Sequence, residues 1–590
     1  MKRILLPLFG AAMTMNAAAE TQESWALLEG PDGKTWSVST VSDMVNLGNE
    51  YYDDFRYNTI NVTLFDAAHQ MKGTFTVDLT GKNANSVDVC GPVTNHLFNA
   101  DDQYELGVQI HIPGSSDNGY VSQILFQAYS LDGSKLIDVE GSGLIVADAQ
   151  NPSFILSRDV VDDSFFGKNV LDFYQPSAAG LELKKSIDLS YELLDYMSGS
   201  PVVTANLSDG AHIIVSHYEK PMVQTNEWGE PMYDPMTWMP LWTPDNSFVI
   251  ENYNSSLEKV DELKVSSACP DGIVARMMGI GLFSNEDVTN GSFTGDDKYN
   301  YVVTCNDMNQ YWMDQYAFDV YAQGNEHVGT LCNNAGGFWN RLSSIEDMPD
   351  QWLFLQMDME TGMEQLSVVE TPSFSQVGTF PSEIDGKLIS SNIDRIADAA
   401  EGFKYVIGLN EPATDAEDNV IAQYGIYHQD LTVDRYVQLN MGPNAETFTP
   451  LVNGQSLDPH LFYADDQREF IFLSKVKGQD GMYYNTLFIG NESGEMLNTF
   501  TGDGTTKGDI RSVSILNYGT EQPELFISYY DEANEKYTNE FLALPLGGGT
   551  VDIKQISTSS PIQGFNLQGQ RTIMSAPGLY IANGKKIIKQ

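Results

Sequence analysis

Two stretches of the chain are nearly identical and decide its fold: HLFNADDQYEL at residues 96–106 and HLFYADDQREF at residues 460–470. A looser copy, SFTGDDKYNY at 292–301, keeps the phenylalanine, the paired aspartates and the apolar run that follows. In each copy a turn rich in Asp, Asn and Gly precedes apolar residues at alternating positions, which predicts strand, turn and strand. Similarity at this level within one chain indicates repeated structural units of one kind.

A second recurring pattern, of strand, polar turn and strand, sets the length of the unit. Its members begin at Leu64, Ala128, Asn252, Val320, Tyr427 and Phe488, with weaker members near Leu181 and Leu355. The steps between the six strong members are 64, 124, 68, 107 and 61 residues. If each of the two long steps spans two units, one unit has about 55 to 65 residues. That length fits a four-stranded propeller blade lengthened by loop insertions. The sequence therefore predicts an all-β fold, a β-propeller of seven or eight blades.

Other repeat architectures fit the pattern less well. A helical solenoid is disfavoured because the apolar residues recur every second position and turn residues interrupt every run. A string of β-sandwich domains would need linkers rich in Pro and Ser, and the body contains none. A propeller also closes its own sheet edges, which removes an aggregation hazard. The strand-like stretch WALLEGPDGKTWSV at residues 25–38 is expected to complete the final blade.

The charge of the chain excludes several classes of partner. It holds 81 acidic and 32 basic side chains, a formal net charge of −49. Nucleic acid and anionic lipid surfaces would be repelled, so we expect neither as a partner. No stretch of the predicted mature chain approaches eighteen uninterrupted apolar residues, so no transmembrane segment is expected there.

The first residues have the pattern of an export signal. A short cationic start, MKR, precedes an apolar stretch at residues 4–15 and the small residues Ala17, Ala18 and Ala19. This pattern predicts a signal peptide over residues 1–19 with cleavage before Glu20. The repeat body is then expected over residues 20–550.

The last forty residues, 551–590, form a basic segment on an acidic chain. They carry five basic residues and one acid, a net +4, while the remaining 550 hold 27 basic and 80 acidic residues, a net −53. A reversal of charge this abrupt indicates a separate unit. Asn583 and Gly584 are the preferred pair for a two-residue hairpin turn, so residues 579–582 and 585–589 are expected to pair as strands.

The tail also resembles a known export module. GFNLQGQR at 564–571 followed by PGLYIANGKKIIKQ at 577–590 is similar to the type A C-terminal sorting domain of type IX secretion substrates. The resemblance implies that the tail is read by the type IX secretion machinery, so that the protein passes the periplasm and becomes secreted or outer-surface exposed. The alternative is that these are the last strands of the globular body. The residues that would carry the sorting signal are Gly569, Gly578, Tyr580, Asn583, Gly584, Lys585 and Lys586.

The acidic turns of the repeat invite comparison with calcium loops. Calcium loops usually place carboxylates at alternating positions and include a glycine at the sharp turn. Here the aspartates are adjacent, so we expect them to cap the turn by accepting hydrogen bonds from their own backbone. No metal site is therefore predicted at Asp101, Asp102, Glu105, Asp296, Asp297, Asp465, Asp466 or Glu469.

Other catalytic or cofactor chemistry has no sequence signature. The eight histidines show no HExxH spacing, and the chain has no GxSxG elbow, P-loop or Cys/His nucleophile pattern. We predict no cofactor and assign no catalytic residue. The four cysteines are Cys90, Cys269, Cys305 and Cys332, and an export route permits disulfides among them. Cys305 and Cys332 end strand-like runs and could lie in neighbouring strands; buried free thiols are the alternative.

One stretch between strands is unusually rich in aromatic residues. Residues 217–245 hold five prolines, which exclude regular structure and predict a long inserted loop. Aromatic rings on such a loop can stack on sugar faces or receive apolar side chains of a partner. The alternative is that the loop buries its own rings as a small satellite core. The candidate ligand-binding residues are Trp228, Tyr233, Trp238 and Trp242.

These observations favour a secreted or cell-surface β-propeller that binds an extracellular glycan or protein. Propellers host enzymes as well as binding proteins, so the lack of a catalytic motif is what favours binding. One alternative is an enzyme that degrades polysaccharide or peptide at the central mouth of the propeller. Another is a structural surface protein without a discrete ligand.

Overall fold

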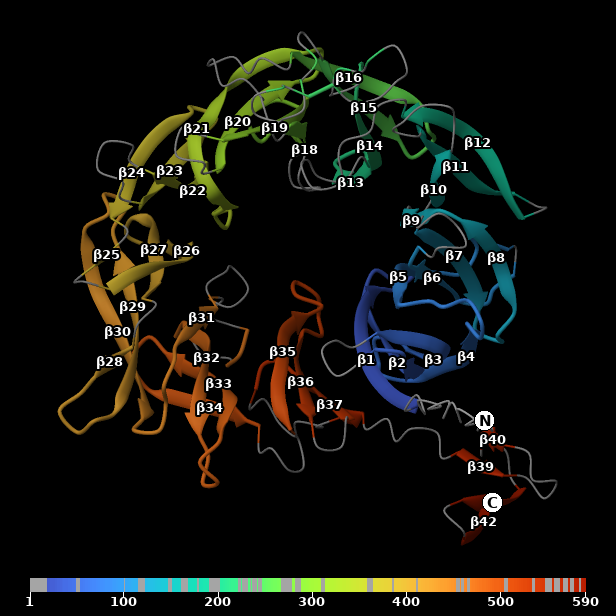
Figure 1. Ribbon diagram of the computed structural model, residues 1–590. Helices are drawn as coiled ribbons and strands as arrows, with labels where there is room; N and C mark the ends of the chain where they lie inside the picture. The colour runs from blue at the N-terminus through green and yellow to red at the C-terminus, as the bar shows by residue number, and fades with distance from the viewer. Residues whose placement is uncertain are drawn as a thin grey trace, which may run out of the picture.

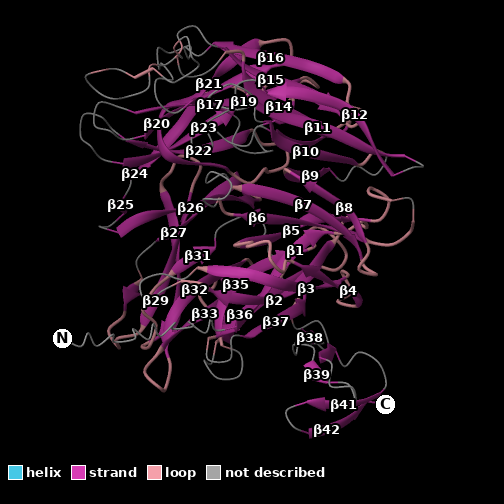
Figure 2. Cartoon of the chain, turned by 45° about the vertical axis from the view of Figure 1, so that its right-hand side comes forward, coloured by secondary structure: helices cyan, strands magenta, loops and turns pink. Residues whose placement is uncertain are grey.

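A computed structural model of the protein describes residues 19–546 with internal gaps, together with short strands among residues 554–589. The described part of the chain consists of strands and loops, with no helix (Figure 2). It therefore contains no helix that could cross a membrane. The internal gaps are 49–53, 100, 115–121, 147–150, 161–167, 178–179, 190–201, most of 221–246, 267–278, 282–287, 309–313, 358–363, 382, 385–386, 410–411, 452–456, 458–460, 464–466, 503–507 and 533–535.

The strands form a ring of antiparallel sheets, each built from consecutive segments of the chain (Figure 1). We number these sheets as blades one to nine in chain order. Blade one has strands β1 (Ala19–Glu29), β2 (Thr35–Asn46), β3 (Phe55–Phe65) and β4 (Met71–Asp78). Blade two has β5 (Ser86–Thr94), β6 (Glu105–Ile112), β7 (Gln123–Ser130) and β8 (Lys135–Glu140). Blade three has β9 (Ser142–Val146), β10 (Ser153–Val160), β11 (Lys168–Ser177) and β12 (Gly180–Leu189).

Blades four to six continue the ring, and one long strand joins the last two of them. Blade four has β13 (Val202–Leu207), β14 (Gly210–Tyr218), β15 (Ser247–Asn254) and β16 (Lys259–Ser266). Blade five has β17 (Gly279–Gly281), β18 (Val288–Asn290), β19 (Tyr299–Met308), β20 (Asp314–Ala322) and the first part of β21 (Glu326–Arg341). Blade six has the end of β21 with β22 (Asp350–Met357), β23 (Glu364–Thr371) and β24 (Ser375–Pro381).

The last three blades complete the ring. Blade seven has β25 (Glu383–Ile384), β26 (Lys387–Asp398), β27 (Gly402–Leu409), β28 (Ala413–Thr414), β29 (Val420–Tyr427) and β30 (Val433–Gly442). Blade eight has β31 (Thr449–Leu451), β32 (Glu469–Lys477), β33 (Tyr483–Asn491) and β34 (Met496–Thr501). Blade nine has β35 (Asp509–Leu516), β36 (Glu524–Asp531), β37 (Lys536–Ala543) and β38 (Lys554–Ile556).

The core is divided among the blade interfaces. The described residues form nine hydrophobic clusters, and each cluster joins two blades that are neighbours in the ring. Side chains alternate along a strand, so each inner strand sends one set of apolar residues to the blade before it and the other set to the blade after it. This arrangement confirms a β-propeller and corrects the predicted count, because the described part of the chain has nine blades rather than seven or eight.

Blade nine is the unit that the repeat pattern missed. Its strands β36 and β37 pair from Asp531↔Lys536 outward, and the sequence between them is EANE. The member near Leu355 is also displaced, since it joins β22 to β23 rather than the last two strands of blade six. The composition of the turns was therefore a less reliable guide to the limits of each blade than the pairing of its strands.

The acidic repeat is the loop between the first and second strands of blades two, five and eight. In blade two the buried Glu105 carboxylate accepts hydrogen bonds from the backbone N–H groups of Leu97 at 2.9 Å and Phe98 at 3.0 Å. The Asp101 carboxylate accepts from the N–H of Gln103 at 2.9 Å. Capping of the turn by its own aspartate is confirmed in this copy.

The looser copy in blade five follows the same plan. The Asp296 carboxylate accepts from the N–H of Lys298 at 3.1 Å, and the Asn300 side-chain oxygen accepts from the N–H of Phe293 at 3.0 Å. The side-chain amide of Asn300 in blade five thus occupies the position that the Glu105 carboxylate has in blade two. Residues 464–466, with Asp465 and Asp466, lie outside the described residues.

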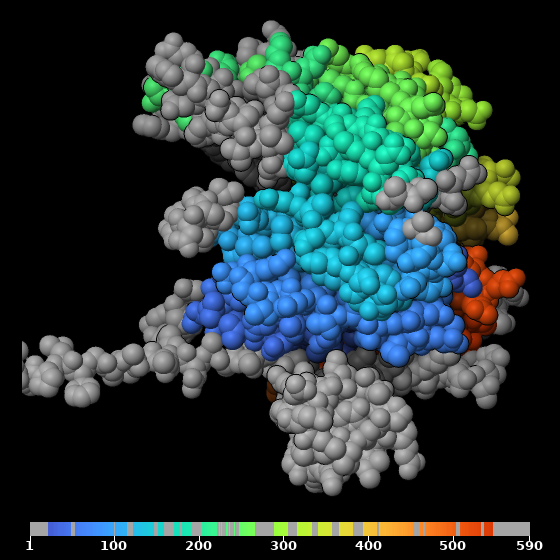
Figure 3. All heavy atoms as spheres, turned by 90° about the vertical axis from the view of Figure 1, so that its right-hand side faces the viewer, coloured from blue at the N-terminus to red at the C-terminus, as the bar shows by residue number. Residues whose placement is uncertain are grey.

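The ring closes without exchange of a strand. Residues 25–38 were expected to complete the final blade, but β1 pairs with β2 inside blade one, with Trp25 opposite Ser39. Blade nine is completed instead by β38, where Phe541 lies opposite Lys554. The expectation for residues 25–38 is wrong because the ring closes through side chains between two complete sheets. In the space-filling view the orange-red atoms of blade nine border the blue atoms of blade one (Figure 3).

Beyond blade nine the structure describes a small sheet of β39 (Gln563–Phe565), β40 (Arg571–Ile573), β41 (Gly578–Ala582) and β42 (Lys585–Lys589). Strands β41 and β42 are antiparallel with Ala582 opposite Lys585, so two residues connect them and the predicted hairpin is confirmed. Gly578 and Tyr580 lie in β41, and Lys585 and Lys586 lie in β42. Gly569, Asn583 and Gly584 lie outside the described residues, as do residues 1–18.

The cysteine pair suggested by the sequence is not adjacent. Cys305 lies in β19 and Cys332 in β21, and β20 runs between them with Phe318 opposite Cys332. Two strand spacings separate them by about 9.5 Å, which exceeds the Cα separation that a disulfide allows. Cys332 is a buried free thiol, and Cys90 is a second free thiol whose burial and the nearby Asp88 raise its pKa to about 11. Cys269 lies outside the described residues.

Candidate functional site

A polar pocket of about 600 Å³ lies where the first strands of four consecutive blades end. These strands are β13, β18, the end of β21 and β26, and they lie on the inner side of the ring (Figure 1). The pocket is therefore at one mouth of the central channel, on the face where the first strand of each blade turns into the second. We name it the channel pocket.

Amides and hydroxyls dominate the channel pocket. Asn206 and Asn340 are exposed at the strand ends, while Asn290 accepts a hydrogen bond from the backbone N–H of Ser208 at 2.7 Å, which ties blade five to blade four. Such groups both donate and accept hydrogen bonds, so they suit a ligand with many hydroxyl or amide groups. The remaining lining residues are Leu207, Val288, Thr289, Ser292, Arg341, Leu342, Ser343, Ser344 and Asp394.

Asp394 is the one carboxylate among the described lining residues, and it is already engaged. It is 4% exposed and accepts from the N–H of Ser343 at 2.7 Å and from the Ser343 hydroxyl at 2.6 Å. The N–H of Arg395 donates a third bond at 2.8 Å. Burial raises the pKa of Asp394, and these three hydrogen bonds oppose the rise. The carboxylate holds the turn of blade six against blade seven rather than facing a substrate.

A buried guanidinium completes that joint between blades six and seven. Arg395 is 1% exposed, and its guanidinium donates to the carbonyl oxygens of Ser343 at 2.8 and 3.0 Å and of Pro349 at 2.7 Å. Its plane lies over the ring of Phe403, with 5.3 Å between the guanidinium carbon and the ring centroid. The floor of the pocket is thus fixed by hydrogen bonds before any ligand enters.

Two polar atoms of the lining have no hydrogen-bond partner among the described residues. These are the buried Nε of Arg341 and the buried Oγ1 of Thr289. Another nitrogen of Arg341 donates to Asp350 at 2.7 Å, so its charge is compensated. Buried polar groups are normally paired, and unpaired ones beside a pocket are a common sign of a site that a ligand or water completes.

The aromatic loop predicted as a binding site joins β14 to β15, at the opposite end of blade four from the channel pocket. Tyr233 is 52% exposed. Three backbone hydrogen bonds, of which one runs from the N–H of Gln224 to the carbonyl of Leu241 at 2.7 Å, draw its described segments together. Trp228, Trp238 and Trp242 lie outside the described residues, so the structure neither joins them to Tyr233 nor separates them.

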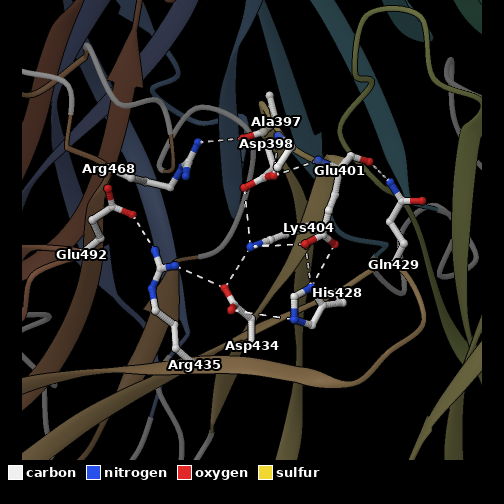
Figure 4. Close-up of polar contacts among 11 residues, drawn as sticks. Ala397, Asp398, Glu401, Lys404, His428, Gln429, Asp434, Arg435, Arg468 and Glu492 are labelled. Carbon is white, nitrogen blue, oxygen red and sulfur yellow. Dashed lines mark hydrogen bonds and ion pairs between the residues drawn. The ribbon is translucent and has the colours of Figure 1, made fainter.

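A dense group of charges lies elsewhere, on blades seven and eight (Figure 4). Lys404 lies 3.0 Å from Asp434 and 3.6 Å from both Asp398 and Glu401, and the bond to Asp434 raises the pKa of Lys404. His428 lies 2.8 Å from Glu401. Every charge here has an opposite neighbour, so the network stabilises the turns of blade seven rather than offering a binding site.

That network also bridges the two blades. Arg435 of blade seven lies 3.2 Å from Asp434 and 2.9 Å from Glu492 of blade eight. Arg468 of blade eight donates to the carbonyl oxygen of Ala397 at 3.4 Å. Within the described residues no group of three or more His, Cys, Asp or Glu side chains is placed to hold a metal ion.

Comparison with known proteins adds no family. No protein-family model and no curated protein matches the chain. Among solved structures, an exotype rhamnogalacturonan lyase, YesX, is 12% identical with a TM-score of 0.37, over 88% of this chain and 84% of that one. A Bacillus licheniformis rhamnogalacturonan lyase is 10% identical with a TM-score of 0.30, over 97% and 90%.

An acylaminoacyl peptidase from Pyrococcus horikoshii is 8% identical with a TM-score of 0.28, over 75% of this chain. The chain spans 57% of the length of that peptidase. At these scores the likenesses carry no argument about activity, so the function has to be argued from the residues of this chain.

Proposed function

We propose that the protein is an extracellular β-propeller that binds a glycan in the channel pocket. The observation that carries the proposal is the lining itself, in which amides and hydroxyls from three consecutive blades, four to six, converge on about 600 Å³. Pockets of this size hold ligands of a few sugar units or a short peptide. The ligand hydroxyls would hydrogen-bond to the exposed amides of Asn206 and Asn340.

A glycan fits the lining better than an apolar partner does. Leu207, Val288 and Leu342 are the apolar members of the described lining, and Leu342 is buried in the core between blades six and seven. The described lining therefore offers little apolar surface, and its charged groups, Arg341 and Asp394, are held by the protein. Neutral hydrogen-bonding groups remain to select the ligand.

Export by a type IX secretion system is the second part of the proposal. The signal-like residues 1–19 and the resemblance of the basic tail to a sorting domain support it. The protein would then act outside the cell or on its outer surface, with the secretion machinery as the partner of the tail.

Binding is tested on a glycan array with two pairs of variants. We expect Asn206→Ala with Asn340→Ala to weaken glycan binding at least tenfold, since each lost hydrogen bond removes about 1 kcal/mol. Trp238→Ala with Trp242→Ala is the matched pair for the aromatic loop and should leave that binding unchanged. The opposite pattern would place the glycan on the loop and reject the channel pocket.

Export is tested by deleting residues 557–590, which spares β38 because that strand pairs with β37 in blade nine. We expect a folded body with an unchanged melting temperature that stays in the periplasm. Normal appearance of the truncated protein outside the cell would reject the sorting role of the tail.

A further inference from the structure

A second pocket, of about 450 Å³, lies where the ring closes. Its walls come from the β1–β2 and β3–β4 turns of blade one, the loop before β6 in blade two and the β35–β36 turn of blade nine. We name it the seam pocket, and we name the interface between blades nine and one the seam. The lining residues are Pro31, Asp32, Lys34, Trp36, Asp66, Ala67, Ala68, Lys72, Asn95, Tyr104, Asn517, Gln522 and Glu524.

Two of the three carboxylates in this pocket are engaged by neighbouring side chains. Asp66 lies 2.6 Å from the ammonium of Lys72 and also caps its own turn by accepting from the N–H groups of Ala68 and Gln70. Burial acts to raise the pKa of the Asp66 carboxyl, but these bonds lower it overall. Glu524 of blade nine lies 2.9 Å from the Nε2 of His69 in blade one.

The third carboxylate, that of Asp32, has described hydrogen-bond partners at only one of its two oxygens. One oxygen of Asp32 accepts from the indole N–H of Trp36 at 2.8 Å and from the N–H of Lys34 at 3.3 Å. Its second oxygen has no partner among the described residues. Trp36 itself is buried, with its ring edge-on to Tyr104 at 4.8 Å between centroids, so Tyr104 forms the aromatic wall.

Four lining side chains make no hydrogen bond or ion pair with any described residue. They are Lys34 of blade one, Asn95 and Tyr104 of blade two, and Gln522 of blade nine. One ammonium, two amides and a phenol, together with the open oxygen of Asp32, give a set of donors and acceptors whose net charge is zero. They come from three blades that are otherwise joined only by side chains or short loops.

We propose that the seam pocket binds a neutral saccharide that bridges blades nine, one and two. Adjacent hydroxyls of a sugar ring pair with amide groups, which both donate and accept, and with a carboxylate, which accepts. The C–H face of the ring would lie against Tyr104 and the two alanines, since an aromatic side chain offers an apolar face and a polar tip. An anionic ligand is disfavoured by the net charge of the chain, and a cation would have a single half-free carboxylate.

Binding of such a ligand at the seam should affect the stability of the ring. Beside the pocket, the seam contains buried polar atoms without partners among the described residues, namely Ser37 Oγ, His69 Nδ1 and both polar atoms of the Asn539 side chain. A ligand held by Gln522 on one side and by Lys34 and Asn95 on the other would fasten blade nine to blades one and two. Ligand binding should therefore stabilise the closed ring, because only in that state do all three blades contact the ligand together.

The test uses the full chain and a panel of neutral sugars: glucose, galactose, mannose, rhamnose and N-acetylglucosamine, with glucuronate and glucosamine as charged comparisons. Binding is measured by calorimetry, and its position by hydrogen exchange of β2 and β36. We expect at least one neutral sugar to bind and to slow exchange in both strands. Asn95→Ala with Gln522→Ala should weaken that binding at least tenfold.

The variant pair should fold normally, since neither side chain is bonded to any described residue, and an unchanged melting temperature without sugar checks this. Asn206→Ala with Asn340→Ala, in the channel pocket, should leave the protection of β2 and β36 intact. The proposal is overturned if no neutral sugar binds, if a charged sugar binds tighter, or if binding survives the Asn95 and Gln522 substitutions. If glycan binding is lost only in the variant that combines Asn206→Ala and Asn340→Ala, the proposed function holds and the seam site is rejected.

Discussion

The seam and the interface between blades seven and eight hold the same ring together by different means. The described core of the seven–eight interface has fourteen buried apolar residues, among them Phe472 and Phe488, whose rings stack with 5.2 Å between centroids. The seam has three, Leu516, Phe526 and Phe541, with Leu27 packed against them. Since buried apolar area is the main stabilising term, the seam is the weaker joint.

Polar groups take the place of the missing apolar residues at the seam. The His69 ring lies 3.9 Å from that of Phe541 and bonds to Glu524, and the N–H of Thr35 donates to Asn517 at 2.8 Å. Asn539 lies two positions from Phe541 on β37 and so faces the same way, yet it has no partner among the described residues.

The contrast follows from the way the chain builds the ring. Blades seven and eight are joined by a short connection, so their facing residues meet at high effective concentration. The first and last blades share no strand, so the seam must hold them through side-chain contacts and hydrogen bonds such as that of Thr35 rather than through strand pairing. The lesson is that a propeller without strand exchange has one interface that can be tuned separately from the others.

The largest effect is expected in the stronger interface. Phe472→Ala removes a side chain that is 0% exposed, and the loss of packing and the cavity should lower the free energy of unfolding by about 3–5 kcal/mol. Leu27→Ala is the matched change at the seam, where the side chain is partly buried, and about 1 kcal/mol is expected. Denaturant unfolding measures both, and equal losses would contradict the ranking of the two interfaces.

A smaller effect is expected from the polar contact at the seam. Glu524→Ala leaves His69 Nε2 without its partner and should cost about 1–3 kcal/mol, confined to the closing blades. Hydrogen exchange should become faster in β2 and β36 while β29 and β32 keep their protection. Glu532→Ala removes a 78% exposed partner of Arg511 and serves as the control that should change neither. General loss of protection would show that the seam is not an independent unit.

The smallest effect is expected from the ion network of blades seven and eight. The hydrogen bond from Lys404 lowers the pKa of Asp434. A carboxyl with a lowered folded pKa stabilises the protein above its unfolded value, about 3.9, and that contribution is lost as the pH falls through the folded pKa.

Asp434→Asn should therefore destabilise the protein by no more than about 1 kcal/mol at pH 6, and the difference from the wild type should vanish once the pH falls below the lowered folded pKa of Asp434. Unfolding titrations across this range measure it. A difference that persists at low pH would mean that Asp434 acts through packing and not through its charge.

Alternation of apolar residues was enough to predict strands, turns and a propeller, because the period-two pattern of apolar and polar residues is local, as in WSVS at residues 36–39. The same segment also indicates that the seam is polar, since Ser37 and Ser39 alternate with Val38 and are both buried. The blade count was missed because the repeat pattern has no member in blade nine.

The channel pocket could not be predicted in this way. Asn206, Asn290, Asn340 and Asp394 share only their place near the inner end of a blade's first strand, and they are scattered along nearly two hundred residues. Their convergence depends on ring closure, which no local pattern encodes. The aromatic loop was conspicuous because composition marks it, whereas amides at strand ends are ordinary in sequence.

The most direct test of the account compares native-state hydrogen exchange in four inner strands of the unmodified protein. Strands β2 and β36 flank the seam, and β29 and β32 flank the seven–eight interface; all four are hydrogen-bonded on both sides. The account predicts that β2 and β36 exchange at least tenfold faster, because the seam opens at a lower free energy. Equal protection in all four strands would contradict it.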